Sequence, residues 1–277
     1  MKIIVAKTAG FCFGVKRAVD IAFKTAKKKQ EGVFTLGPII HNPQVIEKLK
    51  QEGIQPIEDI DAPGIEDIII RTHGIPLQLM NRISESGFNI IDATCPFVKK
   101  AQRYAKLLRE EGYQVIILGD RGHPEVQGLM SYAGDDAVVV DSEKALPKIK
   151  RNVGIVVQTT QPVEALKKLF GKVIEQVKNV KVYNTICSST ALRLKETAAM
   201  AKKVNIMLVV GGKNSANTTQ LAKLCRSLSV PTYHIETSAE LISEWMNGAD
   251  SVGITAGAST PDWIIEDIIK RAKEIGG

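Results

Sequence analysis

The feature that most constrains this chain is a motif that occurs three times. Each copy is a short run of β-branched residues that ends in a cysteine and is followed at once by a helical pattern. The three cysteines, Cys12, Cys95 and Cys187, are 83 and 92 residues apart in a chain of 277 residues. The sequence therefore divides into near-thirds, and an internal repeat of this kind predicts three similar structural units.

Two polar loops recur in step with the cysteines. The first follows an apolar strand and lies 28 or 29 residues after each cysteine, and the second ends another strand 61, 64 or 72 residues after it. One repeat therefore reads strand–cysteine–helix, strand–polar loop–helix, strand–polar loop. The polar residues are His41, His123 and Ser215 in the first loops and His73, Thr159 and Ser259 in the second.

Continuous apolar strands that alternate with helical patterns predict an α/β fold with parallel sheets covered by helices on their faces. The cysteines and the polar loops all follow the carboxyl ends of strands. We expect them to converge if the three units pack around a pseudo-threefold axis. Two of the predicted helices are short, at residues 142–149 and 239–245.

The cysteines suggest a metal centre. Each precedes a helix N-terminus, whose positive dipole favours a thiolate. Zinc sites usually contain tight Cys-x-x-Cys pairs, which this chain lacks, whereas three isolated thiolates suit a 4Fe–4S cluster with one open iron. The alternative is that each cysteine is a small buried core residue, and the phased repeat argues against it. The fourth, Cys225, lies among leucines on a helix without a counterpart, so we expect a core residue there.

The polar loops suggest an anion site. Their His, Ser, Thr and Asn side chains, Asn217 included, carry few obligatory charges and suit a di- or triphosphate. Glu125 allows two interpretations. As a first-turn acid it merely favours the helix dipole, but in a desolvated pocket it can act as a general acid. Its position beside His123 favours the second interpretation.

The composition of the chain limits the kinds of molecule that it is expected to bind and the compartment in which it is expected to work. A surplus of seven positive charges and a pI of about 9.1 favour a phosphorylated small molecule, an acidic protein or nucleic acid. No apolar run is long enough to span a bilayer. Lys7 interrupts the N-terminal apolar run, so we expect no signal peptide, and four cysteines in a chain of this length suggest a reducing cytoplasm rather than a disulfide framework.

Together these motifs resemble one known family, 4-hydroxy-3-methylbut-2-enyl diphosphate reductase, also called the IspH/LytB family. The resemblance covers essentially the whole chain. The segments that carry it are residues 10–18, 37–43, 71–74, 92–96, 122–125, 158–160, 185–187 and 257–262.

The resemblance implies three α/β lobes with small, mainly parallel sheets around a pseudo-threefold axis, with one 4Fe–4S cluster at the centre. The implied lobes are residues 14–95, residues 96–186, and residues 1–13 plus 187–277, so the N-terminal strand joins the last lobe. The implied cluster ligands are Cys12, Cys95 and Cys187.

The implied reaction is the two-electron reductive dehydroxylation of 4-hydroxy-3-methylbut-2-enyl diphosphate to isopentenyl and dimethylallyl diphosphate, the last step of the methylerythritol phosphate route to isoprenoids. The substrate hydroxyl binds the open iron, Glu125 is the proton donor, and Thr159 and His123 belong to the proton-delivery network. Electrons come from a ferredoxin- or flavodoxin-like protein. The residues implied to hold the diphosphate are His41, His73, His123, Ser215, Asn217 and Ser259.

One position departs from the family pattern. The phosphate-binding run commonly reads Ser-Ser-Asn, and here it reads Ser215-Ala216-Asn217. The backbone N–H of Ala216 still offers a donor, and one neutral hydrogen bond contributes roughly 0.5–1.5 kcal/mol. We therefore expect weaker substrate binding at most.

Two other functions compete with this one. Quinolinate synthase also has a three-lobed plan and a three-cysteine cluster, but its carboxylate substrates predict arginines at the strand ends, and here only Arg71 and Arg121 lie near them. A basic nucleic-acid-binding protein with a structural metal fits the pI. Against it stand an aromatic content of 5% and the absence of a recognised nucleic-acid motif. We therefore expect partners that are neither nucleic acid nor membrane.

Overall fold

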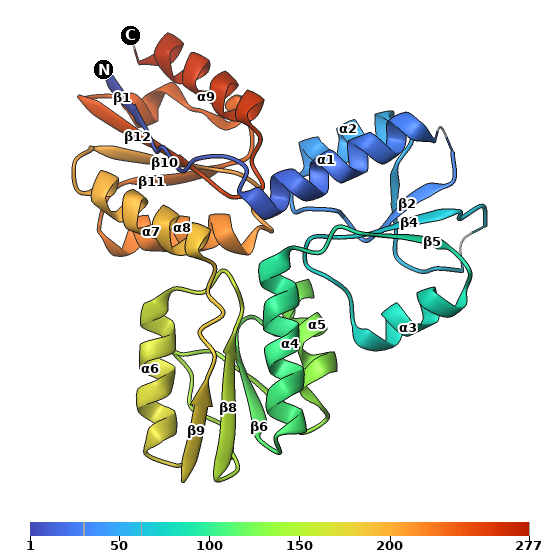
Figure 1. Cartoon of the computed structure of the whole chain (residues 1–277). Helices are drawn as coiled ribbons and strands as arrows, with labels where there is room; N and C mark the ends of the chain where they lie inside the picture. The colour runs from blue at the N-terminus through green and yellow to red at the C-terminus, as the bar shows by residue number, and fades with distance from the viewer. Residues whose placement is uncertain (30, 62, 277) are drawn as a thin grey trace. The chain divides into compact units, whose positions relative to one another are not determined.

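The computed structural model describes residues 1–29, 31–61 and 63–276. In this part of the chain the backbone forms three four-stranded sheets, and every strand pairing in them is parallel. Helices lie on the faces of each sheet, as Figure 1 shows. The predicted α/β class with parallel sheets is confirmed. None of the helices in the described residues is both long enough and apolar enough to cross a membrane.

The first sheet of the chain contains β2 and its neighbours, in the order β3-β2-β4-β5. Its strands are β2 (Val33–Leu36), β3 (Gln55–Ile57), β4 (Asp67–Ile70) and β5 (Asn89–Asp92). Its helices are α1 (Phe13–Lys28), α2 (Pro43–Gln51) and α3 (Leu77–Glu85). The central strand β4 is buried along its whole length because helices cover both faces of the sheet.

The second sheet has the order β7-β6-β8-β9. Its strands are β6 (Gln114–Leu118), β7 (Val138–Val140), β8 (Asn152–Val157) and β9 (Asn179–Val182). Its helices are α4 (Pro96–Glu110), α5 (Pro124–Ala133) and α6 (Val163–Ile174). The helices α4 and α5 share one apolar core with β6 and β8, and α6 packs on the opposite face.

The third sheet has the order β1-β12-β10-β11. Its strands are β1 (Lys2–Val5), β10 (Ile206–Val210), β11 (Thr232–Ile235) and β12 (Ser251–Ala256). Its helices are α7 (Ser188–Ala201), α8 (Ala216–Ser227) and α9 (Asp262–Ile275), with α7 and α8 on one face and α9 on the other. The N-terminal strand β1 pairs with β12 in register Lys2 to Ser251. This confirms that the first strand belongs with the last third of the chain.

The three sheets share one topology, which confirms the internal repeat. In each, the strand before the first polar loop (β2, β6 or β10) lies between an edge strand (β3, β7 or β11) and the strand before the second polar loop (β4, β8 or β12). The fourth position is taken by β5, β9 and β1, the strands that lead to Cys95, Cys187 and Cys12.

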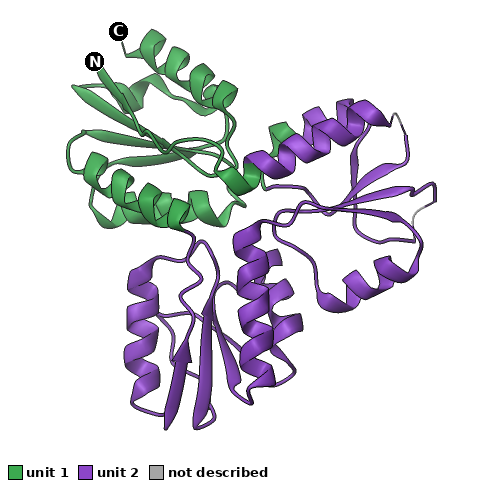
Figure 2. Cartoon of the chain, in the orientation of Figure 1, with its two compact units in different colours: residues 1–15, 41–45, 188–277 green, residues 16–40, 46–187 purple. Residues whose placement is uncertain are grey.

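The chain separates into two compact units, coloured green and purple in Figure 2. Unit 1 contains residues 1–15, 41–45 and 188–277, and unit 2 contains residues 16–40 and 46–187. Unit 2 therefore includes both the first and the second sheet. The predicted three-lobe boundaries and the pseudo-threefold axis stay predictions.

Two predicted helices are wrong and one strand was missed. Residues 142–149 contain no helix, because Pro147 lacks an N–H and disfavours helical geometry in the residue before it. Residues 239–245 form parts of two 3₁₀ turns, Ser238–Glu240 and Ser243–Met246, rather than one helix. The missed strand β3 contains Pro56, which a sheet tolerates at an edge position.

Candidate functional site

The three cysteines predicted to bind a cluster each lie directly before a helix. The backbone of each is hydrogen-bonded to the end of a neighbouring strand. In all three repeats the cysteine N–H donates a hydrogen bond to a carbonyl in the second polar loop. The segment that bears the thiol is therefore held by the sheet that also presents the polar residues. The donor and acceptor pairs are Cys12 and Ala258 (3.3 Å), Cys95 and Thr72 (3.0 Å), and Cys187 and Thr159 (3.0 Å).

The cysteines differ in exposure as the repeat predicts. Cys12, Cys95 and Cys187 are partly exposed. Cys225 is buried in the core between α8 and the third sheet, and burial raises the pKa of its thiol to about 11. The prediction that Cys225 is a core residue is confirmed.

A 4Fe–4S cluster takes thiolate ligands, so three partly exposed thiols at helix starts fit such a group. Cys12 belongs to unit 1 and the other two cysteines to unit 2. That all three bind one cluster stays a prediction.

Glu125 lies in the first turn of α5 and is 2% exposed, within unit 2. Thr159, at the end of β8, binds both carboxylate oxygens. Its N–H donates to Oε1 at 2.7 Å and its hydroxyl donates to Oε2 at 2.8 Å. Burial raises the pKa of Glu125 to about 7, and the two hydrogen bonds from Thr159 keep it from rising further. The desolvated environment predicted for this carboxyl group is therefore present.

His123 is the N-cap residue of α5, and its Nδ1 accepts a hydrogen bond from the N–H of Glu125 at 3.2 Å. An accepting Nδ1 carries no proton. From this hydrogen bond we assign the neutral tautomer with its proton on Nε2. The Nε2–H is then the group that His123 can donate to an oxygen of a ligand.

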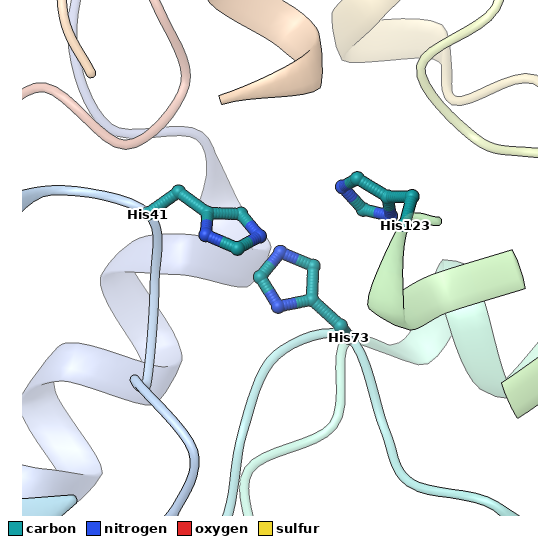
Figure 3. A group of neighbouring side chains, drawn as sticks. All are labelled: His41, His73 and His123. Carbon is teal, nitrogen blue, oxygen red and sulfur yellow. The ribbon is translucent and has the colours of Figure 1, made fainter. Parts of the chain in front are cut away.

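His73 follows β4 and contacts His123 edge to face. The two ring centroids are 5.2 Å apart and the ring planes are inclined by 85°. Figure 3 shows these two side chains beside each other. The preceding residue, Thr72, holds the Cys95 N–H through its carbonyl. Unit 2 therefore brings together His73, His123, Glu125 and Thr159 with two of the cysteine segments.

Unit 1 brings together the other predicted anion-binding residues. The hydroxyl of Ser259 donates to the carbonyl of His41 at 3.2 Å and lies 3.5 Å from the hydroxyl of Ser215. The side-chain oxygen of Asn217 accepts from the N–H of Ala258 at 3.0 Å. This last bond orients the Asn217 amide so that its NH₂ group is the end that remains for a ligand.

The helix α8 adds backbone donors to this set. Ser215 is its N-cap and accepts from the N–H of Thr218, and Ala216 and Asn217 form the first turn. The N–H groups of a first turn have no intrahelical acceptor and favour anions. A side chain on Gly212 would place its Cβ 2.6 Å from the carbonyl of His41. The close approach of these two loops therefore requires glycine at that position.

The structure adds residues that the sequence did not single out. The guanidinium of Arg17 donates to the carbonyls of Asp92 and Thr94, which precede Cys95 by three residues and one residue. The guanidinium of Arg193 donates to the carbonyls of Gly10 and Ala256. Charge pattern alone does not distinguish these arginines from those that face solvent. The available signal was their spacing, five residues after Cys12 and six residues after Cys187.

Known proteins match the chain over nearly its whole length. A family model described as LytB protein matches residues 3–273. A relative from Trichlorobacter lovleyi named 4-hydroxy-3-methylbut-2-enyl diphosphate reductase is 47% identical over 99% of this chain and 99% of its own. A relative of the same name from Geobacter sulfurreducens is 48% identical over 99% of this chain and 98% of its own.

Two solved structures agree with these relatives. One is described as (E)-4-hydroxy-3-methyl-but-2-enyl diphosphate reductase, the terminal enzyme of the non-mevalonate pathway. It is 44% identical, covers 99% of this chain and 100% of its own, and superposes with a TM-score of 0.70. The other, the E-1-hydroxy-2-methyl-but-2-enyl-4-diphosphate reductase from Plasmodium falciparum, is 26% identical. It covers 97% of this chain and 87% of its own, with a TM-score of 0.91.

Proposed function

The chain belongs to the LytB protein family, and from this membership we propose that it reduces 4-hydroxy-3-methylbut-2-enyl diphosphate to isopentenyl and dimethylallyl diphosphate. One observation carries the proposal. Glu125 is buried with a pKa of about 7, and the threonine that binds its carboxylate also binds the Cys187 segment through its carbonyl. A proton donor is therefore attached, through Thr159, to a candidate cluster ligand.

The reaction consumes two electrons and two protons. The allylic C–O bond breaks, the hydroxyl leaves as water after it takes one proton, and the second proton adds to a carbon of the allyl group. The position of that carbon decides which of the two products forms. The protein must therefore deliver protons at a defined place and exclude other proton sources.

The residues that would hold the cofactor are Cys12, Cys95 and Cys187, which we propose as ligands of one 4Fe–4S cluster. When bound, such a cluster would supply the electrons of the reduction, and with three cysteine ligands it would leave one iron without a protein ligand.

We assign the proton donor to Glu125. A carboxyl group with a pKa of about 7 is protonated in about half of the molecules at neutral pH, and an acid is most effective when its pKa lies near the working pH. The hydroxyl of Thr159 is 2.8 Å from the carboxyl oxygen, so it accepts the proton from the protonated acid and donates its own onward. Thr159 is thus the first relay for protons that leave Glu125.

We propose that the diphosphate is held by donors with few obligatory charges. In unit 2 these are the Nε2–H of His123 and the ring of His73. In unit 1 they are the hydroxyls of Ser215 and Ser259, the Asn217 amide, the first-turn N–H of Ala216, and His41. Many neutral or His⁺ hydrogen bonds and a helix N-terminus stabilise phosphate charge. Because Ala216 contributes only its backbone, one hydroxyl donor is missing from this set.

The electron donor that we propose is a ferredoxin- or flavodoxin-like protein. Proteins of this kind are acidic, and the chain carries a surplus of seven positive charges. Complementary charge accelerates encounter and makes it sensitive to salt. We place the reaction in the cytoplasm.

The test combines cluster assembly with turnover. Protein prepared without oxygen is assayed for iron and sulfide, and then for oxidation of a reduced dye that depends on the allylic diphosphate. We expect Glu125→Gln to keep the iron and lose turnover by roughly 10²–10⁴-fold, the usual contribution of a general acid. The matched control is Asp120→Asn in the same loop, where the exposed carboxylate binds only a local backbone N–H among its described hydrogen bonds.

Two results would contradict the proposal. A protein with full iron that does not consume this substrate would redirect the search to cluster enzymes that act on carboxylate substrates. A protein that gains no iron after anaerobic reconstitution would remove the basis for the three-cysteine assignment.

A further inference from the structure

Two of the three cysteine segments are held by arginines that the proposed reaction does not use. We propose that Arg17 and Arg193 are positioning residues for the cluster ligands, Arg17 for Cys95 and Arg193 for Cys12. The proposal is that they fix the ligand segments through backbone carbonyls and supply positive charge to the cluster. This inference rests on the proposed role of the cysteines as cluster ligands.

Arg17 lies on α1, within unit 2, and its side chain is half-buried. Its Nη1 donates to the carbonyl of Thr94 and its Nη2 to the carbonyl of Asp92, both at 3.3 Å. Thr94 is the residue directly before Cys95. The Asp92 side chain in turn accepts the Thr94 N–H at 2.9 Å. One guanidinium therefore binds both carbonyls that frame the turn leading to the thiol.

Arg193 makes the equivalent contact in unit 1. It lies on α7 and is 2% exposed. Its Nη1 donates to the carbonyl of Ala256 at 2.6 Å and its Nη2 to the carbonyl of Gly10 at 3.0 Å. Gly10 is two residues before Cys12, and Ala256 ends the strand that pairs with β1. The guanidinium thus joins the Cys12 segment to the sheet.

Glu196, one turn along α7 from Arg193, holds the start of the same segment. Its carboxylate accepts the N–H of Lys7 at 2.8 Å and both the N–H and the hydroxyl of Thr8, at 2.9 and 2.6 Å. Burial alone would raise the pKa of Glu196, but these hydrogen bonds outweigh it and lower the pKa. The helix that begins after Cys187 therefore binds the segment that leads to Cys12 from residue 7 to residue 10.

The two arginines occupy similar positions in the repeat. Each lies on the helix that follows one cysteine, and each binds the segment that precedes another: the helix after Cys12 holds the Cys95 segment, and the helix after Cys187 holds the Cys12 segment. The third helix differs. Tyr104 of α4 stacks on Tyr183, with ring centroids 4.0 Å apart, four residues before Cys187. The guanidinium–carbonyl contact is therefore described at the Cys95 and Cys12 segments.

A buried guanidinium is costly unless its N–H groups are satisfied, and a lysine cannot bind two carbonyls in this forked geometry. A positive charge at the ligand segments also stabilises the more negative, reduced form of a cluster. Net charge and hydrogen bonding near the ligands are among the factors that set cluster potentials. Arginine at these positions therefore has two separable effects, on ligand geometry and on redox potential.

The experiment compares Arg17→Met and Arg193→Met with Arg17→Lys and Arg193→Lys. The matched controls are Lys24→Met on α1 and Lys195→Met on α7, which replace exposed cations on the same helices. Two quantities are measured in reconstituted protein without substrate. These are the rate of iron release to a chelator under argon and the reduction potential from a titration monitored by electron paramagnetic resonance.

We expect iron release roughly tenfold faster in the methionine variants, the usual effect of losing a charge-assisted hydrogen bond, and a more negative potential. The Arg17→Lys and Arg193→Lys variants should have a reduction potential close to that of the parent protein, because the positive charge remains. They should still release iron faster than the parent, because lysine cannot bind both carbonyls at once. If Arg193→Met fails to fold by circular dichroism, Arg193→Lys carries the same comparison at that site.

The inference would be overturned if the folded Arg17→Met and Arg193→Met variants released iron as slowly as the Lys24→Met and Lys195→Met controls and kept the reduction potential of the parent protein. The reductase assignment would be untouched by that result. Conversely, a parent protein that binds the cluster but does not turn over the diphosphate would overturn the proposed function and leave the inference standing, since neither measurement uses substrate.

Discussion

The pKa of Glu125 can be tested without cofactor or substrate, through the stability of the apoprotein. The carboxyl group has an ordinary pKa of 4.5 and a folded-state pKa of about 7. Because the folded state holds this proton more tightly than the unfolded chain, the group stabilises the fold fully below its unfolded pKa. That stabilisation is lost as the pH rises through the folded pKa. Between about pH 5 and about pH 8, linkage with these two pKa values predicts a loss of about 2 to 3 kcal/mol.

Glu125→Gln keeps the shape of the side chain and removes the titration. Urea unfolding of the parent and the variant at both pH values gives four free energies of unfolding. The change between the two pH values in the parent, minus the same change in the variant, is the contribution of the Glu125 carboxyl group; this quantity is the difference of differences. Contributions from groups that the substitution leaves unchanged occur in both proteins and cancel. The control is Glu164→Gln, an exposed first-turn acid of α6, for which we expect the two proteins to show the same pH dependence. A difference of differences near zero for Glu125→Gln would refute the assignment of a burial-raised pKa and, with it, the choice of proton donor.

Three further predictions concern the site. Thr159→Val removes the hydroxyl that favours the charged form of Glu125, so its pKa should rise by about one unit or more, given the strength of hydrogen bonds to charged groups. The basic limb of the pH–rate profile should move upward by the same amount, and an unmoved limb would count against the hydrogen bond from the Thr159 hydroxyl to Glu125. Cys225→Ala should leave the iron content per chain at the parent level, because this thiol is a core residue; a loss of iron in folded protein would contradict that role. Gly212→Ala should raise KM for the diphosphate with little change in kcat, because its Cβ would press on the carbonyl of His41; an unchanged KM in steady-state assays would show that the loop adapts.

The fold could be predicted from the spacing of apolar residues, and from the glycines and prolines that end helices and strands, to the extent that local sequence determines local structure. The apolar strand–helix alternation correctly predicted parallel sheets, because strands buried on both faces need apolar residues throughout. It failed where the local signal was weak. Gln55 and Pro56 do not resemble a strand, and β3 forms because β2 offers an unpaired edge that accepts a proline-containing neighbour. At residues 142–149 the apolar spacing suggested a helix, but Pro147 opposes it.

The candidate site divides in the same way. The polar residues were predictable because they end strands in every repeat, and the carboxyl ends of parallel strands form one edge of a sheet. The raised pKa of Glu125 was only a conditional expectation, since it depends on how closely α5 and β8 pack around the carboxylate. The roles of Arg17 and Arg193 were not predicted at all, because a guanidinium that binds backbone carbonyls leaves no partner residue type in the sequence.

Thr159 joins Glu125 to the Cys187 segment through three of its groups, two of the backbone and one of the side chain. Its N–H and hydroxyl bind Glu125, and its carbonyl binds the N–H of Cys187. The corresponding residue of the first repeat, Thr72, also accepts the cysteine N–H through its carbonyl, but its N–H and its hydroxyl both donate to the carbonyl of Ile39 and not to an acid. The two strand ends are thus alike in binding a cysteine segment and differ in whether they also bind a buried carboxylate. The acid is therefore a specialisation of one repeat, placed where its burial by α5 raises its pKa and where the strand end that orients it already holds a cysteine.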